Sequence, residues 1–288
     1  MVPRDFFGVE RTKERYIYWR SHYNDTYIYK INPYKEEGGR AILNIFSLFK
    51  SGYMKAKGAP ALIPAGKIGS LKINGNQVII VTVRKENSTT ANVSFYIKER
   101  KEKWILDFSA IGYIGKNGIG KAKEGDNKTP VGLYHFTAAF GVAPKPAHTK
   151  IPYVKVNETH WLVSDPNSKY YNRFVSTSES KEGYPWTRDG YPKVKEADID
   201  WDTSRGEQLY KYPKAYKYSL ILNYNTENAP HKGSAIFLHC YADDKYTAGC
   251  VAIPPSKMKY LIHKLDVNNQ NEIETPIIID RLDNILKY

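Results

Sequence analysis

Cysteine is scarce in this chain, and long apolar stretches are missing. The 288 residues include only two cysteines, Cys240 and Cys250, so each thiol can be considered individually. No apolar run approaches the roughly 20 residues that a membrane-spanning helix needs. The best stretch, residues 41–49, is interrupted by Asn44 and Ser47. We therefore expect no transmembrane segment in this sequence.

The first residues also lack the apolar core of a secretory signal peptide. The chain begins Met1-Val2-Pro3-Arg4-Asp5. Two alternatives stay open from the residues alone. Either the protein stays inside the cell, or its export segment is absent from this sequence.

Acidic residues are few relative to basic ones. There are 30 Asp and Glu against 43 Lys and Arg, which gives a formal net charge of +13 and a pI near 9.4. This charge favours anionic partners. The basic residues are spread along the whole chain and accompany no nucleic-acid-binding motif, so we expect no nucleic-acid partner. An anionic cell-wall polymer fits the charge, and so does a role in solubility alone.

Composition and length predict a globular protein with a short N-terminal appendage. Hydrophobic residues make up 41% and charged residues 25%, and a chain of this size can bury a substantial core. Residues 1–67 are rich in Tyr, contain 12 Lys and Arg and 6 Asp and Glu, and end in a stretch of Pro, Gly and Ala that is typical of a linker. We predict a basic, Tyr-rich segment over residues 1–67, of unknown role, and a larger globular domain over residues 68–288.

Most of the larger part alternates or clusters apolar residues as strands do. Asn74-Gly75 is a favoured hairpin turn, which predicts strands on both sides of it. The expected strands cover residues 71–73, 77–83, 93–97, 104–108, 111–114, 131–136, 217–222, 235–238 and 276–279. One helix is expected after Pro254-Pro255-Ser256, with Met258, Leu261, Ile262 and Leu265 on its apolar face. The fold class is therefore mainly β with a few helices.

Two possible ligand sites can be rejected. Residues 115–122 nearly spell a phosphate-binding loop, but Ala122 stands where a hydroxyl would bind magnesium, and turn residues follow instead of a helix. The His, Cys and Asp residues between His231 and Cys250 show none of the short spacings of zinc sites. We expect no nucleotide, no metal and no other cofactor.

The strongest signal combines a histidine and a cysteine. His239 ends an apolar strand-like run, and Cys250 follows a small flexible turn, Thr247-Ala248-Gly249. A thiol nucleophile needs a base to take its proton and backbone N–H groups beside it. The alternative is a structural disulfide between Cys240 and Cys250, which are ten residues apart in the sequence.

These residues resemble the L,D-transpeptidase catalytic domain of the YkuD type over about residues 75–280. The resemblance rests on segments 115–118, 124–132, 224–225 and 233–239 and, most specifically, on Thr247-Ala248-Gly249-Cys250. It implies a mainly β domain, a curved sheet sandwich whose groove carries the cysteine. It also implies an extracytoplasmic enzyme of the cell envelope, acting on peptidoglycan stem peptides. Ala248 replaces a histidine of the usual signature.

The resemblance implies a role for each candidate residue. Cys250 would be the nucleophile and His239 its base, and the backbone carbonyl of Cys240 would hold the imidazole. Gly249 and Cys250 could offer N–H groups to an oxyanion. Candidates for contacts with substrate are Thr247, Ala248, Tyr224, Asn225 and the loop of residues 124–130.

The predicted activity is cysteine-dependent acyl transfer. A tetrapeptide stem would lose its terminal D-alanine to form a thioester, and the amine of a second stem would then form a 3-3 cross-link. Hydrolysis of the thioester would instead make an L,D-carboxypeptidase. A papain-type peptidase fits less well, because its cysteine precedes its histidine. A non-enzymatic wall-binding module with a Cys240–Cys250 disulfide is the remaining alternative.

Overall fold

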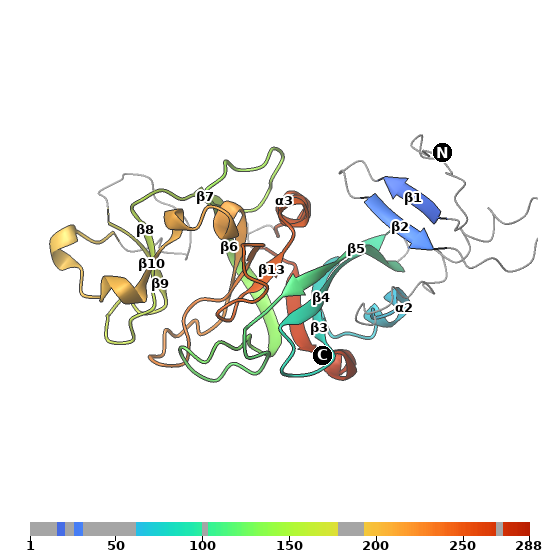
Figure 1. Cartoon of the computed structure of the whole chain (residues 1–288), viewed down its shortest axis with the longest axis horizontal. Helices are drawn as coiled ribbons and strands as arrows, with labels where there is room; N and C mark the ends of the chain where they lie inside the picture. The colour runs from blue at the N-terminus through green and yellow to red at the C-terminus, as the bar shows by residue number, and fades with distance from the viewer. Residues whose placement is uncertain (1–15, 21–25, 31–61, 100–102, 178–192, 269–272) are drawn as a thin grey trace, which may run out of the picture. The chain divides into compact units, whose positions relative to one another are not determined.

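The computed structural model describes residues 16–20, 26–30, 62–99, 103–177, 193–268 and 273–288 (Figure 1). The chain divides into two compact units, Met1–Ala56 and Lys57–Tyr288. In the first unit, β1 (Tyr16–Arg20) and β2 (Thr26–Lys30) pair antiparallel. The predicted separation of residues 1–67 from 68–288 stays a prediction. Residues 62–67 pack within the second unit, where α2 (Ala65–Ile68) begins and Ile63 is buried.

A large sheet forms the frame of the second unit. Its strands are β3 (Gln77–Val83), β4 (Thr90–Glu99), β5 (Lys103–Tyr113), β6 (Gly132–Gly141), β7 (Tyr153–Lys155), β11 (Ser219–Leu222), β12 (Phe237–Cys240), β13 (Val251–Ile253) and β14 (Pro276–Arg281). They are ordered β11-β12-β13-β5-β4-β3-β14-β6-β7, and β11 also pairs with β6. That extra pairing closes the strands from β11 to β6 into a ring, and β7 lies outside the ring, paired with β6 alone. The prediction of a mainly β fold is confirmed.

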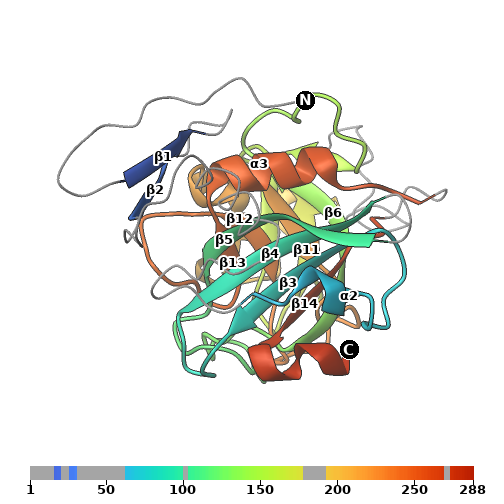
Figure 2. The same ribbon diagram turned by 90° about the vertical axis from the view of Figure 1, so that its right-hand side faces the viewer.

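The helices of the described residues are short. The longest of them is α3 (Pro255–Lys264), which lies beside β12. The 3₁₀ helices are η1 (Glu196–Asp198), η2 (Thr203–Arg205), η3 (Leu209–Lys211), η4 (Ala215–Lys217) and η5 (Leu282–Lys287). In Figure 2, α2 and the C-terminal η5 lie near β3 and β14, and buried Ile68 and Ile285 seal this contact.

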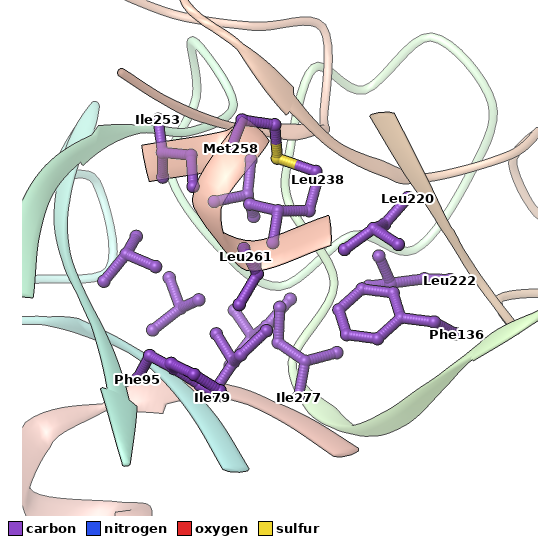
Figure 3. Close-up of a cluster of buried hydrophobic side chains, with 14 of the residues drawn as sticks. Ile79, Phe95, Phe136, Leu220, Leu222, Leu238, Ile253, Met258, Leu261 and Ile277 are labelled. Carbon is purple, nitrogen blue, oxygen red and sulfur yellow. The ribbon is translucent and has the colours of Figure 1, made fainter. Parts of the chain in front are cut away.

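The main core lies between the sheet and α3. The predicted apolar face of α3 is confirmed, because Met258, Leu261, Ile262 and Leu265 are all buried in this core. Figure 3 shows Met258 and Leu261 among side chains from several strands, including Leu238, Ile253, Ile79, Phe95 and Ile277. Burial of this apolar area is the main stabilising contribution to the fold.

A small separate sheet covers part of the frame. The strands β8 (His160–Val163), β9 (Arg173–Ser176) and β10 (Gly206–Gln208) form this cap sheet, in the order β10-β8-β9 (Figure 1). Its inner face joins a second group of buried residues, the cap cluster: Ala138, Phe140, Val154, Val156, Leu162, Leu209, Tyr216, Ile221 and Phe237. The cap cluster therefore separates the cap sheet from β6, β11 and β12.

Differences from the sequence prediction have local causes. Residues 71–73 were predicted as a strand and this is wrong, because β3 pairs with β4 and β14 and the Lys72 N–H binds the carbonyl of Tyr288. The two strands predicted over residues 104–114 are one strand, β5. The strands β7, β8, β9, β10 and β13 were not predicted, since segments of three or four residues carry too little alternation.

Candidate active site

Two neighbouring parallel strands bring the histidine and the second cysteine to one face. β12 and β13 pair with Leu238 opposite Val251 and His239 opposite Ala252. Alternate residues, including Leu238 and Cys240, enter the main core, whereas Phe237 and Cys250 pack in the cap cluster. Because side chains alternate along a strand, His239 lies on the face of Phe237. His239 and Cys250 are therefore diagonal neighbours under the cap cluster.

His239 is held by the backbone and is almost buried, with 7% exposure. Its Nδ1 donates a hydrogen bond of 2.8 Å to the carbonyl of Cys240. This bond leaves Nε2 as the basic nitrogen of the neutral ring. Burial lowers the pKa of His239 to about 4, against the opposing effect of the carbonyls of Cys240 and Ala215. The imidazole is therefore neutral at neutral pH and able to accept a proton.

Cys250 is a free, half-buried thiol. Its sulfur accepts a hydrogen bond of 3.3 Å from the N–H of Phe237. Burial raises the pKa of Cys250 to about 12; the Phe237 N–H opposes this, Glu207 adds to it and Lys121 opposes it. The pair rests as neutral thiol and neutral imidazole, so proton transfer must accompany the attack.

Cys240 lies on the other face. It is buried in the main core, and its Sγ contacts the carbonyl of Tyr218 at 3.5 Å. Both cysteines are free, and their side chains enter different clusters on opposite faces of the sheet. The alternative of a Cys240–Cys250 disulfide is therefore wrong.

The turn before Cys250 is clamped by a threonine. Thr247 Oγ1 donates to the carbonyl of Cys250 at 2.6 Å and accepts from the N–H of Gly249 at 3.1 Å. In this arrangement the Gly249 N–H is already used, which leaves the N–H of Cys250 as the better oxyanion donor of the two. Ala248 is exposed beside them.

Glycine is required at position 249. Its φ of +148° is a conformation that other residues rarely adopt. A Cβ there would lie 2.9 Å from the carbonyl oxygen of Lys128 and 3.7 Å from Nζ of Lys121. Gly249 therefore lets the loop of residues 124–130 lie close to the backbone beside Cys250.

Lys121 is a site residue that the sequence reasoning missed. Its side chain is only 3% exposed and pairs with Asp126 at 3.2 Å. Asp126 also accepts from the N–H groups of Ala122, Lys123 and Lys128, which orders the loop and lowers the pKa of its carboxyl despite the opposing effect of burial. The ammonium group lowers the pKa of Cys250. The sequence signal for Lys121 is the glycine-rich segment of residues 115–122, which we rejected above as a phosphate-binding loop.

Tyr224 and Asn225 shape a neighbouring loop. Tyr224 donates to the carbonyl of Lys232 at 2.8 Å, and burial raises the pKa of its hydroxyl to about 12. The Asn225 amide donates to the carbonyls of Ala229 and Gly233 at 3.0 and 2.9 Å. Both side chains thus use their polar atoms within the loop of residues 224–233.

Two further residues next to the thiol carried no sequence signal. Tyr216 packs its ring against those of His239 and Phe237, each at a centroid distance of 5.6 Å. Its hydroxyl donates to Glu207 Oε1 at 2.7 Å. Glu207 comes from the cap sheet and Tyr216 from η4, so only the folded chain brings them to the site.

A pocket of about 510 Å³ opens at the far end of β12. Lys214, Lys217, Tyr241 and Asp243 contribute to its lining. Tyr241 follows Cys240 directly, and η4, which carries Lys217, contacts β12. The pocket therefore lies next to the segment that holds the base, with room for a peptide group.

The fold and this site together define a mainly β domain that carries a histidine and a free cysteine on one face of its sheet. A family model for the YkuD L,D-transpeptidase catalytic domain matches residues 80–279. This match covers more than half of the chain, so the chain belongs to the YkuD family, and the resemblance seen in the sequence is confirmed. The family acts on peptidoglycan outside the cytoplasm. No curated protein matches the chain.

One finding bears on the membrane. Among the residues that the structure describes, no helix has the length and apolar character to cross a bilayer.

Proposed function

We propose that this chain is a cysteine-dependent peptidoglycan L,D-transpeptidase. Membership of the YkuD family supports the reaction class. The observation that carries the residue assignment is the β12–β13 register, in which Cys250 and His239 share one face and Nδ1 of His239 is fixed on the Cys240 carbonyl. The working location is the cell envelope, where the net charge of +13 also suits anionic wall polymers.

In the first step, Sγ of Cys250 attacks the carbonyl carbon of the third residue of a tetrapeptide stem. A C–S bond forms as the C–N bond to D-alanine breaks. The thiol proton passes to His239 Nε2 and from there to the departing amine. The Cys250 N–H and the nearby Lys121 ammonium favour the negative charge that develops on the carbonyl oxygen.

In the second step, the amine of another stem attacks the thioester. A C–N bond forms, the C–S bond breaks, and the amine proton returns through His239 to the sulfur. The product is a 3-3 cross-link. Water in place of the amine would give L,D-carboxypeptidase activity from the same residues.

Mass spectrometry of the products from purified muropeptides tests this proposal. The chain should release D-alanine from tetrapeptide stems and form cross-linked dimers, while the Cys250→Ala variant should do neither. Intact-mass analysis should also find a carbapenem adduct on the wild type and none on the variant. Tripeptides without dimers would replace the proposal with the carboxypeptidase. D-alanine release by the variant would remove Cys250 from the mechanism.

A further inference from the structure

The cap sheet carries a carboxylate on its apolar underside. In the register of β10 with β8, Glu207 stands opposite Leu162, so both side chains leave the sheet on the same face. Leu162 is buried in the cap cluster together with Tyr216 and Phe237. Glu207 therefore turns toward the face of β12 that carries His239 and Cys250.

This carboxylate has no cationic partner among the described residues. Its hydrogen bond comes from the hydroxyl of Tyr216, and none of the ion pairs in the described ranges includes it. Burial raises the pKa of Glu207, and the Tyr216 hydroxyl opposes that shift. Glu207 is half-buried, and a charge partly removed from water without a cationic partner is costly. The buried Tyr216 hydroxyl needs one acceptor here, which a neutral side chain could equally supply, so the negative charge itself has no structural partner.

Glu207 is also close to the reacting atoms. Tyr216, which binds it, packs on both His239 and Phe237, and the Phe237 N–H binds Cys250 Sγ. Negative charge at this distance raises the pKa of Cys250 and so opposes the first step of the reaction. Any benefit of Glu207 to the reaction must therefore come in the second step, the transfer of the acyl group to the acceptor.

We propose that Glu207, anchored by Tyr216, is the subsite that binds the primary ammonium group of the acyl acceptor. This inference rests on the proposed function. An acceptor amine arrives protonated and cannot attack until it loses a proton. The carboxylate supplies the missing ion pair and accepts that proton, leaving Glu207 neutral and the amine free to attack. The proton then leaves to solvent when the acceptor has reacted.

Such a subsite separates the two fates of the thioester. An ammonium group gains an ion pair from Glu207 in a site of low polarity, whereas water carries no charge and gains none. Glu207 thereby favours cross-linking over hydrolysis. The specificity for an amine acceptor comes from the cap sheet, while thioester chemistry comes from β12 and β13.

The Glu207→Gln variant tests this, because the amide keeps the acceptor atom for Tyr216 and removes only the charge. The assay uses a disaccharide-tetrapeptide donor and a tripeptide acceptor with a free side-chain amine, and measures dimer and hydrolysed product by mass spectrometry. The ratio of dimer to hydrolysed product should fall about tenfold, since the acceptor ammonium loses its partner in a partly desolvated charge pair. Thioester formation should become faster, because the Cys250 pKa falls. Tyr216→Phe, which keeps the ring packing, should lower the ratio less.

Two controls separate the possible outcomes. Glu158→Gln removes an exposed carboxylate just before β8 and should leave both rates unchanged. An acceptor with an acetylated amine should give no dimer with any variant. An unchanged ratio in Glu207→Gln, or an equal slowing of thioester formation and transfer, would overturn the ammonium subsite. Failure of the wild type to release D-alanine from the donor alone would instead overturn the proposed function.

Discussion

The two cysteines lie in different environments, on opposite faces of the β12–β13 strand pair. Cys240 enters the main core and Cys250 the cap cluster, and burial raises the pKa of each thiol to about 12. The two thiols therefore do not differ in acidity. Each thiol has one lysine nearby that opposes this shift, Lys217 for Cys240 and Lys121 for Cys250, but only Cys250 shares its face with the neutral imidazole of His239. Reactivity here depends on the partner that takes the proton.

This comparison gives a second result for Cys240. Its side chain belongs to the core, yet its carbonyl faces the histidine and fixes the imidazole. One residue therefore contributes to packing through its sulfur and to the site through its backbone. The group that orients the His239 imidazole can be an uncharged carbonyl, because it fixes the tautomer without adding a negative charge beside the thiol.

Removing the base, His239, should have the largest effect on the activity that distinguishes the two cysteines. We expect His239→Gln to lower kcat/KM about a thousandfold or more, close to the loss in Cys250→Ala, because base and nucleophile act as one unit. Without its base, Cys250 has no more means of ionising than Cys240 does. Steady-state D-alanine release measures this effect. The control His263→Gln changes an exposed histidine of α3 and should leave the rate unaltered.

The low pKa of His239 predicts how the activity depends on pH. Since the His239 pKa is lowered to about 4, the imidazole stays unprotonated and competent down to mildly acidic pH. The acid limb of kcat/KM should therefore lie near pH 4, and not near the usual histidine value of about 6.5. A limb at the usual value would show that His239 is solvated in the working enzyme. Activity in His239→Gln near that of the wild type would remove the base from the mechanism.

An intermediate effect is expected from removing the lysine that acts on Cys250. Lys121→Met removes the charge that opposes burial at Cys250, so the thiol pKa should rise further. Alkylation of Cys250 by iodoacetamide at fixed pH should slow by about three- to tenfold, because one pKa unit changes the thiolate fraction tenfold. The rate should be recovered at higher pH. Peptide mapping assigns the modified residue.

Lys123→Met is the matched control, since Lys123 is exposed two residues away. It should leave the alkylation rate unchanged. Equal rates for wild type and Lys121→Met, or an equal slowing in both variants, would contradict an electrostatic role for Lys121. A slower rate that no rise in pH recovers would indicate a misplaced loop.

The sequence predicted the parts of this site that depend on local patterns. The strand ending at His239, the turn before Cys250 and the helix after Pro254 each leave a signal within ten residues. The parallel pairing of β12 with β13 does not, because it joins segments through a loop whose return direction the residues do not encode. Glu207 and Tyr216 were missed because β10 and η4 are too short to show a period.

Lys121 was missed for a different reason. Its glycine-rich surroundings favour a phosphate loop or a surface turn, and both interpretations leave the lysine in solvent. In the structure, Gly233 and Gly249 leave space for it, and a Cβ at Gly233 would lie 2.4 Å from its Cε. These glycines are far from Lys121 in sequence. Only the three-dimensional arrangement shows that they provide space for a buried cation.

The smallest expected effect on activity completes the comparison of the two cysteines. Cys240→Ala removes a buried sulfur from the main core but keeps the carbonyl that binds His239. We expect turnover within about twofold of the wild type and a loss of about 1–2 kcal/mol in the free energy of unfolding, from lost packing. Denaturant unfolding and D-alanine release measure the two quantities.

Cys250→Ala should give the opposite pattern, little change in stability and no turnover. If Cys240→Ala instead abolished turnover while remaining folded, the Cys240 sulfur would have a chemical role, and the division of labour between the two faces would be wrong.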